Sequence, residues 1–267
     1  MQDLYYLDKM EIINKESNIT FDSILKGSFR IYQQKEGYRV GTDAILLAAS
    51  VNPIKGRLID LGAGVGTLSI IIARKNNKIK IDSIEKDFNT FKLLSKNIKF
   101  NQLEESILPV YSDIKDLPTN YKGCFDHVIS NPPFYRKNKK ISFNNPKNLG
   151  YYDENITIME WIEISSLKLK NKGRITIIIS TERMDEVIVS LKKCGVGEII
   201  IFPIWSFCGD KSIRVIISGR KGVISGMAIL SGLVLYKKNG SLTDEAQKVM
   251  DGSNIFLKHP NAQHINY

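Results

Sequence analysis

The tetrapeptide Asn131-Pro132-Pro133-Phe134 is the stretch whose residue types best suit chemistry. Two consecutive prolines fix the backbone and hold the preceding asparagine in an extended, rigid geometry. The side-chain oxygen of Asn131 and the carbonyl of Pro132 can then accept both hydrogens of a planar amine. Such contacts draw the nitrogen lone pair out of conjugation and make the nitrogen nucleophilic. Phe134 can stack on an unpaired or flipped base that carries the amine. The tetrapeptide therefore predicts catalysis at an exocyclic amino group by Asn131, Pro132 and Phe134.

A glycine-rich turn from Asp60 to Gly66 lies upstream of the tetrapeptide. Glycines allow a ligand to approach the backbone closely, and they adopt dihedral angles that other residues avoid. The spacing Gly-x-Gly-x-Gly differs from the dinucleotide fingerprint Gly-x-Gly-x-x-Gly, which disfavours an NAD or FAD site. We therefore expect Asp60, Gly62 and Gly64 to surround a different nucleotide-like cofactor.

Two acidic residues extend this expected cofactor site. Glu85 ends an apolar run about 20 residues past the glycines, the usual offset of a ribose-binding acid, and its carboxylate can accept from both ribose hydroxyls. Asp113 follows the next apolar run and could accept from an adenine amino group, although Ser112-Asp113 is also common turn chemistry.

Short apolar runs that alternate with helical patterns must position these residues. We expect strands at 57–61, 79–84, 107–111, 125–130 and 173–180, and helices at 44–51, 67–74, 87–100 and 155–170. We also expect strands at 198–202, 213–218 and 233–236. Only a loop separates the first two, which favours an antiparallel pair. This alternation indicates an α/β fold with a doubly wound, mostly parallel sheet and an antiparallel edge. Either Thr42 or Asp43 could cap the first helix.

The remaining residues define one domain, at 38–267, with an N-terminal appendage at 1–37 in which 29–32 forms a short strand. His127 is interpreted as a strand residue rather than a base, and Trp161 and Trp205 as packing residues.

The composition of the chain indicates which kinds of partner it binds and in which cellular compartment it resides. The chain has 267 residues, 43% of them hydrophobic, which excludes global disorder. A formal net charge of +10 favours a polyanion such as RNA, although the richness in Lys, Asn and Ile could also arise without binding pressure. Basic residues cluster at 136–140 and 168–174. Three widely spaced cysteines predict neither a disulfide framework nor a zinc site, and the absence of a long apolar run predicts no membrane span. We expect a cytosolic protein with no metal.

With these residues in place, the chain resembles the class I S-adenosylmethionine-dependent methyltransferases that carry an Asn-Pro-Pro-Phe/Tyr motif. More narrowly, it is similar to the bacterial valine-tRNA adenine-37 N6-methyltransferase family. The matching segments are 39–47 (Arg-Val-Gly-Thr-Asp-Ala-Ile-Leu-Leu), 60–66 with Glu85, and 125–135. The stretch 233–246 is also similar but less specific.

The resemblance implies a class I, Rossmann-like, seven-stranded sheet and S-adenosylmethionine as cofactor. It also places Arg39 and Thr42 near the methionine end of the cofactor, and Asn131 and Phe134 at the target adenine. The family usually has Tyr where Phe134 stands, so a hydroxyl is lost while stacking survives. Its basic-aromatic pair before the next helix is here replaced by Gly150-Tyr151, which leaves the substrate less defined than the chemistry.

The resemblance and the charge together predict N6 methylation of adenine in tRNA. The expected substrate-binding residues are Tyr135, Arg136, Lys137, Lys139 and Lys140, where the basic run is either a phosphate clamp or a solvated loop.

Four alternatives stay open. Protein glutamine N5-methylation uses a similar planar amide, but those enzymes generally carry a helical domain before the glycine loop. Guanine N2-methylation of ribosomal RNA also uses an Asn-Pro-Pro-Phe motif. A non-catalytic RNA-binding protein would have no need of an intact Asn131 with both prolines, and a dinucleotide oxidoreductase is disfavoured by the glycine spacing.

Overall fold

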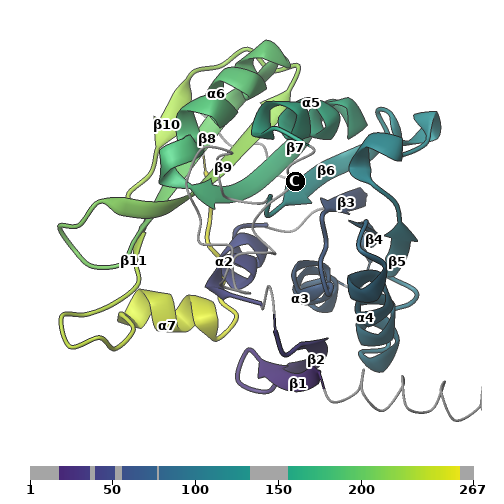
Figure 1. Ribbon diagram of the computed structural model, residues 1–267. Coiled ribbons are helices and arrows are strands. Elements are labelled where there is room, and N and C mark those ends of the chain that lie inside the picture. The colour runs from purple at the N-terminus through teal and green to yellow at the C-terminus, as the bar shows by residue number, and fades with distance from the viewer. Residues whose placement is uncertain (1–17, 37–39, 52–55, 77, 133–155, 259–267) are drawn as a thin grey trace, which may run out of the picture.

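The chain forms one large sheet with helices on both faces, and a separate two-stranded hairpin beside it (Figure 1). The computed structural model describes residues 18–36, 40–51, 56–76, 78–132 and 156–258. Within them the large sheet has nine strands in the order β10-β8-β9-β7-β6-β3-β4-β5, with β11 also paired to β8. Its strands are β3 (Arg57–Leu61), β4 (Lys80–Glu85), β5 (Ile107–Tyr111), β6 (Phe125–Ser130), β7 (Leu169–Ser180), β8 (Val196–Trp205), β9 (Ser212–Lys221), β10 (Met227–Ile229) and β11 (Leu233–Val234).

The central strands are parallel and apolar on both sides. In β3, Leu58, Ile59 and Leu61 are fully buried, because helices cover both faces of the sheet. The strands β5, β4, β3, β6 and β7 pair in parallel, and β9 runs antiparallel to both β7 and β8. The helices are α2 (Thr42–Ser50), α3 (Thr67–Lys75), α4 (Phe88–Phe100), α5 (Ile158–Lys168), α6 (Met184–Lys193) and α7 (Asp244–Met250), with short 3-10 turns at Ile114–Asp116, Thr119–Tyr121 and Thr181–Arg183.

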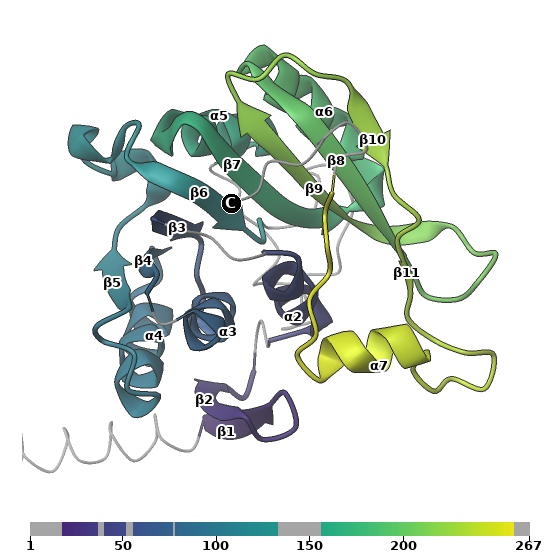
Figure 2. The ribbon, with the colours of Figure 1, turned by 180° about the vertical axis from the view of Figure 1, so that it is seen from behind.

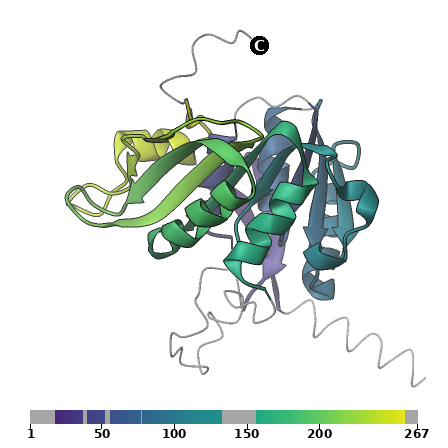
Figure 3. The same ribbon diagram turned by 90° about the horizontal axis from the view of Figure 1, so that it is seen from above.

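The two faces of the sheet carry different sets of helices. Side chains of α2, α3, α4 and α7 share one apolar cluster with one face, and those of α5 and α6 share another with the opposite face. Figure 3 shows α5 and α6 side by side over the sheet, and Figure 2 shows α7 beside α2. This arrangement confirms the predicted doubly wound α/β class.

Side-chain caps mark several helix starts. Asp87 accepts from the backbone N–H of Thr90 at the start of α4, and Thr157 and Glu160 form a reciprocal capping box on α5. The predicted cap of α2 was wrong, because the helix is preceded by Gly41 with no side-chain cap bond. Asp43 instead forms an ion pair with Arg214 of β9 over 3.0 Å.

The N-terminal hairpin consists of β1 (Ile19–Ile24) and β2 (Phe29–Gln34). The strand predicted at 29–32 is confirmed, whereas β1 was not predicted. Phe29 and Ile31 are buried in the apolar cluster that also contains Leu94 and Ile98 of α4. The side-chain amide of Asn97 bonds both the N–H and the C=O of Tyr32. The hairpin is therefore anchored on α4, while the domain division at 37/38 stays a prediction.

The sheet is wider than the seven strands expected. The seven long strands are present, and the short strands β10 and β11 widen the sheet by pairing in parallel with its outer strand β8. The antiparallel pair β8–β9 is confirmed, with β9 lying inside the sheet rather than at its rim. In the described part of the chain, no helix is long and apolar enough to cross a membrane.

Candidate active site

Most described residues of the predicted site meet at the carboxyl edge of the sheet. Leu61, the last residue of β3, pairs with Ile84 of β4 and with Ser130 of β6. The glycine turn, Glu85 and Asn131 therefore leave the sheet side by side. Since neighbouring strands lie about 4.8 Å apart, the ends of β4 and β6 are roughly 10 Å apart with the glycine turn between them. Arg39, Phe134, Tyr135, Arg136, Lys137, Lys139 and Lys140 lie outside the described residues.

The first two glycines of the turn have different surroundings. Gly62 and Gly64 both have positive φ, +74° and +58°. A Cβ on Gly62 would stand 3.2 Å from the Trp161 ring, whereas a Cβ on Gly64 would meet no heavy atom within 4 Å. Gly62 therefore permits internal packing, and Gly64 faces the open space that a cofactor needs to approach the backbone.

Glu85 is held in place by backbone amides. Its Oε2 accepts from the N–H of Gly64 over 2.9 Å, and its Oε1 accepts from the N–H of Asp87 over 2.8 Å. Burial raises the pKa of Glu85, and the backbone hydrogen bonds oppose that rise. Each carboxylate oxygen has a second lone pair, so these bonds leave capacity for ribose hydroxyls.

Asp60 lies beneath the glycine turn with contacts of a different kind. It is 1% exposed, and its carboxylate accepts a hydrogen bond from Ser69 Oγ over 2.7 Å. Ser69 Oγ in turn lies 2.8 Å from Ser83 Oγ. The pKa of Asp60 is raised to about 7, because burial and, to a smaller extent, the charge of Glu85 outweigh the opposing effect of the Ser69 hydrogen bond. These contacts tie β3 to α3 and β4, and the cofactor-binding role of Asp60 stays a prediction.

Asp113 and Thr42 lie at the edges of the site. The carboxylate of Asp113 accepts from the N–H of Lys115 over 3.0 Å and caps a 3-10 turn after β5. Thr42 is an exposed residue at the start of α2. The Asp43–Arg214 ion pair holds this helix start against β9, where Arg214 pairs with Ser180 at the carboxyl end of β7.

A pair of residues beside Asn131 was missed from the sequence. Ser130 donates from Oγ to the carbonyl of Leu61 over 2.7 Å, and Trp161 Nε1 donates to Ser130 Oγ over 3.0 Å. Trp161 is buried, as expected for a packing residue, and its ring also contacts Gly62. The pair therefore links β6, β3 and α5 directly before the first two residues of the tetrapeptide, half-buried Asn131 and buried Pro132. The available sequence signal for this pair was a serine at the end of an apolar strand, directly before the tetrapeptide.

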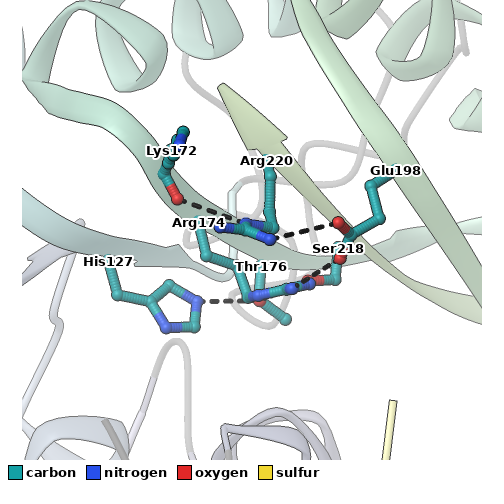
Figure 4. A network of polar contacts seen from close by, with 7 residues as sticks. All are labelled: His127, Lys172, Arg174, Thr176, Glu198, Ser218 and Arg220. Carbon is teal, nitrogen blue, oxygen red and sulfur yellow. Dashed lines mark hydrogen bonds and ion pairs between the residues drawn. The ribbon is translucent and has the colours of Figure 1, made fainter. Parts of the chain in front are cut away.

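His127 belongs to a polar network across the sheet (Figure 4). It is buried in β6, and its Nε2 lies 2.8 Å from Thr176 Oγ1. Burial, together with a smaller effect from the positive charge of Arg174, lowers its pKa to about 3. His127 is therefore a neutral strand residue, as predicted. The network continues through Ser218, Arg174, Glu198 and Arg220 to the carbonyl of Lys172.

The basic cluster at 168–174 is largely neutralised inside the protein. Lys168 is buried, Lys170 pairs with Asp126 over 2.8 Å, and Arg174 pairs with Glu198 over 2.9 Å. This corrects the expectation that the cluster offers free positive charge to a polyanion. Among the described residues, no group of three or more His, Cys, Asp or Glu could hold a metal ion.

The sheet order, the glycine turn and the acidic end of β4 define the class I methyltransferase fold. Residues 35–193 match the model of the methyltransferase small domain, and the chain belongs to this family. Relatives named tRNA1(Val) (adenine(37)-N6)-methyltransferase include one from Flavobacterium psychrophilum, 26% identical over 66% of this chain and 74% of its own. Another, from Dyadobacter fermentans, is 22% identical over 81% of this chain and 90% of its own.

Solved structures support the same fold. A predicted O-methyltransferase from Agrobacterium tumefaciens has a TM-score of 0.66 and 18% identity, covering 81% of this chain and 99% of its own. The M. jannaschii protein TYW2 in complex with AdoMet has a TM-score of 0.55 and 16% identity, covering 76% and 85%. Membership of a methyltransferase family, and the open face of Gly64 beside Glu85, support S-adenosylmethionine as the cofactor.

Proposed function

We propose that this methyltransferase transfers a methyl group from S-adenosylmethionine to N6 of an adenine in tRNA, at the anticodon-loop adenine of a valine tRNA. The observation that carries the proposal is the position of Asn131, which leaves β6 two strands away from Glu85 with the glycine turn between them. The names of the relatives supply the substrate: tRNA1(Val) and its adenine 37.

The residues of the chain have separate tasks in this proposal. Gly64 and Glu85 hold the nucleoside part of the cofactor, which supplies a methyl group on a positively charged sulfur. Asn131 and Pro132 accept the two hydrogens of the adenine amine and orient its nitrogen toward that methyl group. The amine forms the new N–C bond as the C–S bond breaks, and its proton passes to water. Neutral, buried His127 takes no part as a base.

The substrate-binding role of 135–140 belongs to the proposal as well. Tyr135 and the basic run Arg136, Lys137, Lys139 and Lys140 follow the tetrapeptide directly in the sequence. Charge reversal in this run should raise the KM for RNA and leave the affinity for the cofactor unchanged. An unchanged KM for RNA would remove these residues from the proposed interface.

The decisive experiment is transfer of a labelled methyl group from S-adenosylmethionine to bulk tRNA, followed by nucleoside analysis. We expect N6-methyladenosine with the wild-type protein and none with Asn131→Ala. Asn89→Ala, which changes an exposed asparagine of α4, is the matched control and should retain activity. Ribosomal RNA and a glutamine-containing peptide are assayed in parallel. Label in either of these and not in tRNA would overturn the adenine proposal in favour of guanine N2 or glutamine N5 methylation.

A further inference from the structure

Helix α4 exposes a row of cations and aromatic rings on one side. Phe88, Lys92, Lys96, Lys99 and Phe100, here called the α4 stripe, are all exposed. Phe88, Lys92, Lys96 and Phe100 are four residues apart and Lys99 is three after Lys96, which places all five on one helix face. The opposite face buries Leu94 and Ile98 in the core, so the stripe is free to contact a partner.

The hairpin extends this surface with rings and a further cation. Phe21 stacks on Tyr32 with 4.4 Å between ring centroids, and Phe100 meets Phe21 edge-on at 5.0 Å. Lys96 Nζ lies 3.8 Å from the centre of the Tyr32 ring, and the Arg30 guanidinium lies 5.4 Å from that of Phe21. Such contacts hold the cations in place on the surface without neutralising them.

The positive charge of the stripe is not compensated within the described chain. The sequence from 88 to 103 contains no Asp or Glu. Within the described ranges, none of Lys92, Lys96 and Lys99 forms an ion pair. Two cations of β7 differ, because Lys170 and Arg174 are paired with Asp126 and Glu198. Uncompensated cations between exposed rings match the phosphates and base faces of a nucleic acid.

The stripe also begins beside the candidate site. Phe88 starts α4 three residues after Glu85, and its ring lies 5.4 Å from that of Tyr111 at the end of β5. A helix of 13 residues is about 20 Å long at 1.5 Å per residue, so the stripe leads away from the carboxyl edge over that distance. To contact the stripe, an RNA whose target base lies at Asn131 must extend beyond the active site, and a folded tRNA is large enough to do so.

We propose that the α4 stripe binds the phosphate backbone of the RNA substrate and anchors it while the target base occupies the active site. This inference rests on the proposed function, because it takes RNA as the substrate.

The test compares binding of a valine tRNA transcript to the wild-type protein and to K92Q/K96Q/K99Q, by fluorescence anisotropy at 50, 100 and 200 mM KCl (about the range over which phosphate contacts are diagnostic). K193Q/K211Q/K238Q is the matched control, since it removes three exposed lysines elsewhere. We expect the stripe variant to bind about tenfold or more weakly, with the slope of log Kd against log salt reduced by about 2 to 3. The control should bind within about twofold of wild type.

Further readouts separate the possible failures. Affinity for S-adenosylhomocysteine and thermal stability should match wild type in both variants, because glutamine and lysine have similar helix propensity. If the wild-type protein methylates tRNA and both variants bind tRNA equally well, the proposed role of the stripe is overturned and the proposed function stays intact. Absence of both tRNA binding and tRNA methylation in the wild-type protein would overturn both.

Discussion

The carboxylate of Glu85 accepts a hydrogen bond from the backbone N–H of Gly64 over 2.9 Å, across the gap between β4 and the glycine turn. The acidic strand end and the glycine motif are therefore parts of one structure. Each fixes the position of the other before a cofactor is present, which lowers the cost of ordering the site on binding.

Glu85→Gln should weaken binding of S-adenosylmethionine about ten- to hundredfold. The amide retains an acceptor for Gly64 but loses the charge, and a hydrogen bond to a charged group is worth about 1.5–3 kcal/mol. Isothermal titration calorimetry measures the effect. Asp116→Asn, at an exposed acid after β5, is the control and should bind normally. Equal affinities of wild type and E85Q would separate Glu85 from the cofactor.

Alanine at Gly62 and at Gly64 should have different consequences. Both changes strain a left-handed backbone, at about 1–2 kcal/mol each, and only the first also crowds Trp161. We expect Gly62→Ala to lower the melting temperature more, and Gly64→Ala to weaken cofactor binding more, by about tenfold or greater. Thermal unfolding and titration of each variant test this order. A reversal of the two effects would mean that Gly62, not Gly64, faces the ligand.

Trp161→Phe should impair turnover more than binding. It removes the N–H donor to Ser130, at a stability cost of about 1 kcal/mol, and the smaller ring adds the cost of a cavity beside Gly62. Because Ser130 directly precedes Asn131, we expect a lower kcat with unchanged KM values for RNA and S-adenosylmethionine. Trp205→Phe is the control for loss of an indole. A change in KM alone would assign Trp161 to substrate binding instead.

His127 and Asp60 should act on stability in opposite directions as the pH changes. The folded pKa of His127 is lowered to about 3, so its contribution is present above the unfolded value of 6.5 and is lost as the pH falls. The folded pKa of Asp60 is raised to about 7, so its contribution is present below the unfolded value of 3.8 and is lost as the pH rises. Between about pH 4 and 6.5 the two effects oppose each other, each by about 1 kcal/mol per pH unit.

The two variants should therefore show opposite pH dependence in urea unfolding. Relative to wild type, His127→Gln should lose less stability, or gain some, on acidification from pH 6.5 to 4. Asp60→Asn should lose more over the same interval. Parallel stability profiles for wild type and both variants would contradict the buried, shifted state of these groups.

The sequence predicted the parallel core well, because β3, β4, β5 and β6 are short apolar runs in which local pattern and burial agree. It did not predict contacts between distant residues. Asn97 is polar within a helix, which suggests exposure, yet it is fully buried because its amide bonds the hairpin strand at Tyr32. Ser130 and Trp161 are 31 residues apart, and no local pattern indicates their hydrogen bond.

The strands β1 and β10 were missed for a related reason, whereas β11 lies within the strand expected at 233–236. β10 is only three residues long, so its period-two pattern is too short to recognise. β1 is connected to β2 through Leu25 and Lys26, which have positive φ without the Asn-Gly signal of a tight hairpin. The α4 stripe was overlooked because its lysines are spread along a helix rather than clustered in sequence.

The packing of α7 and Ile255 on α2 also constrains how the protein folds during synthesis. Ile255 donates its backbone N–H to the carbonyl of Ala49, and its side chain enters the same apolar cluster as Leu46 and Leu47. The ribosome makes Ala49 long before Ile255, and at about 5–20 residues per second the delay is roughly 10–40 s. During that time part of the apolar surface of α2 stays uncovered, so the helix that begins with Thr42 can complete its packing only after residue 255 has been translated.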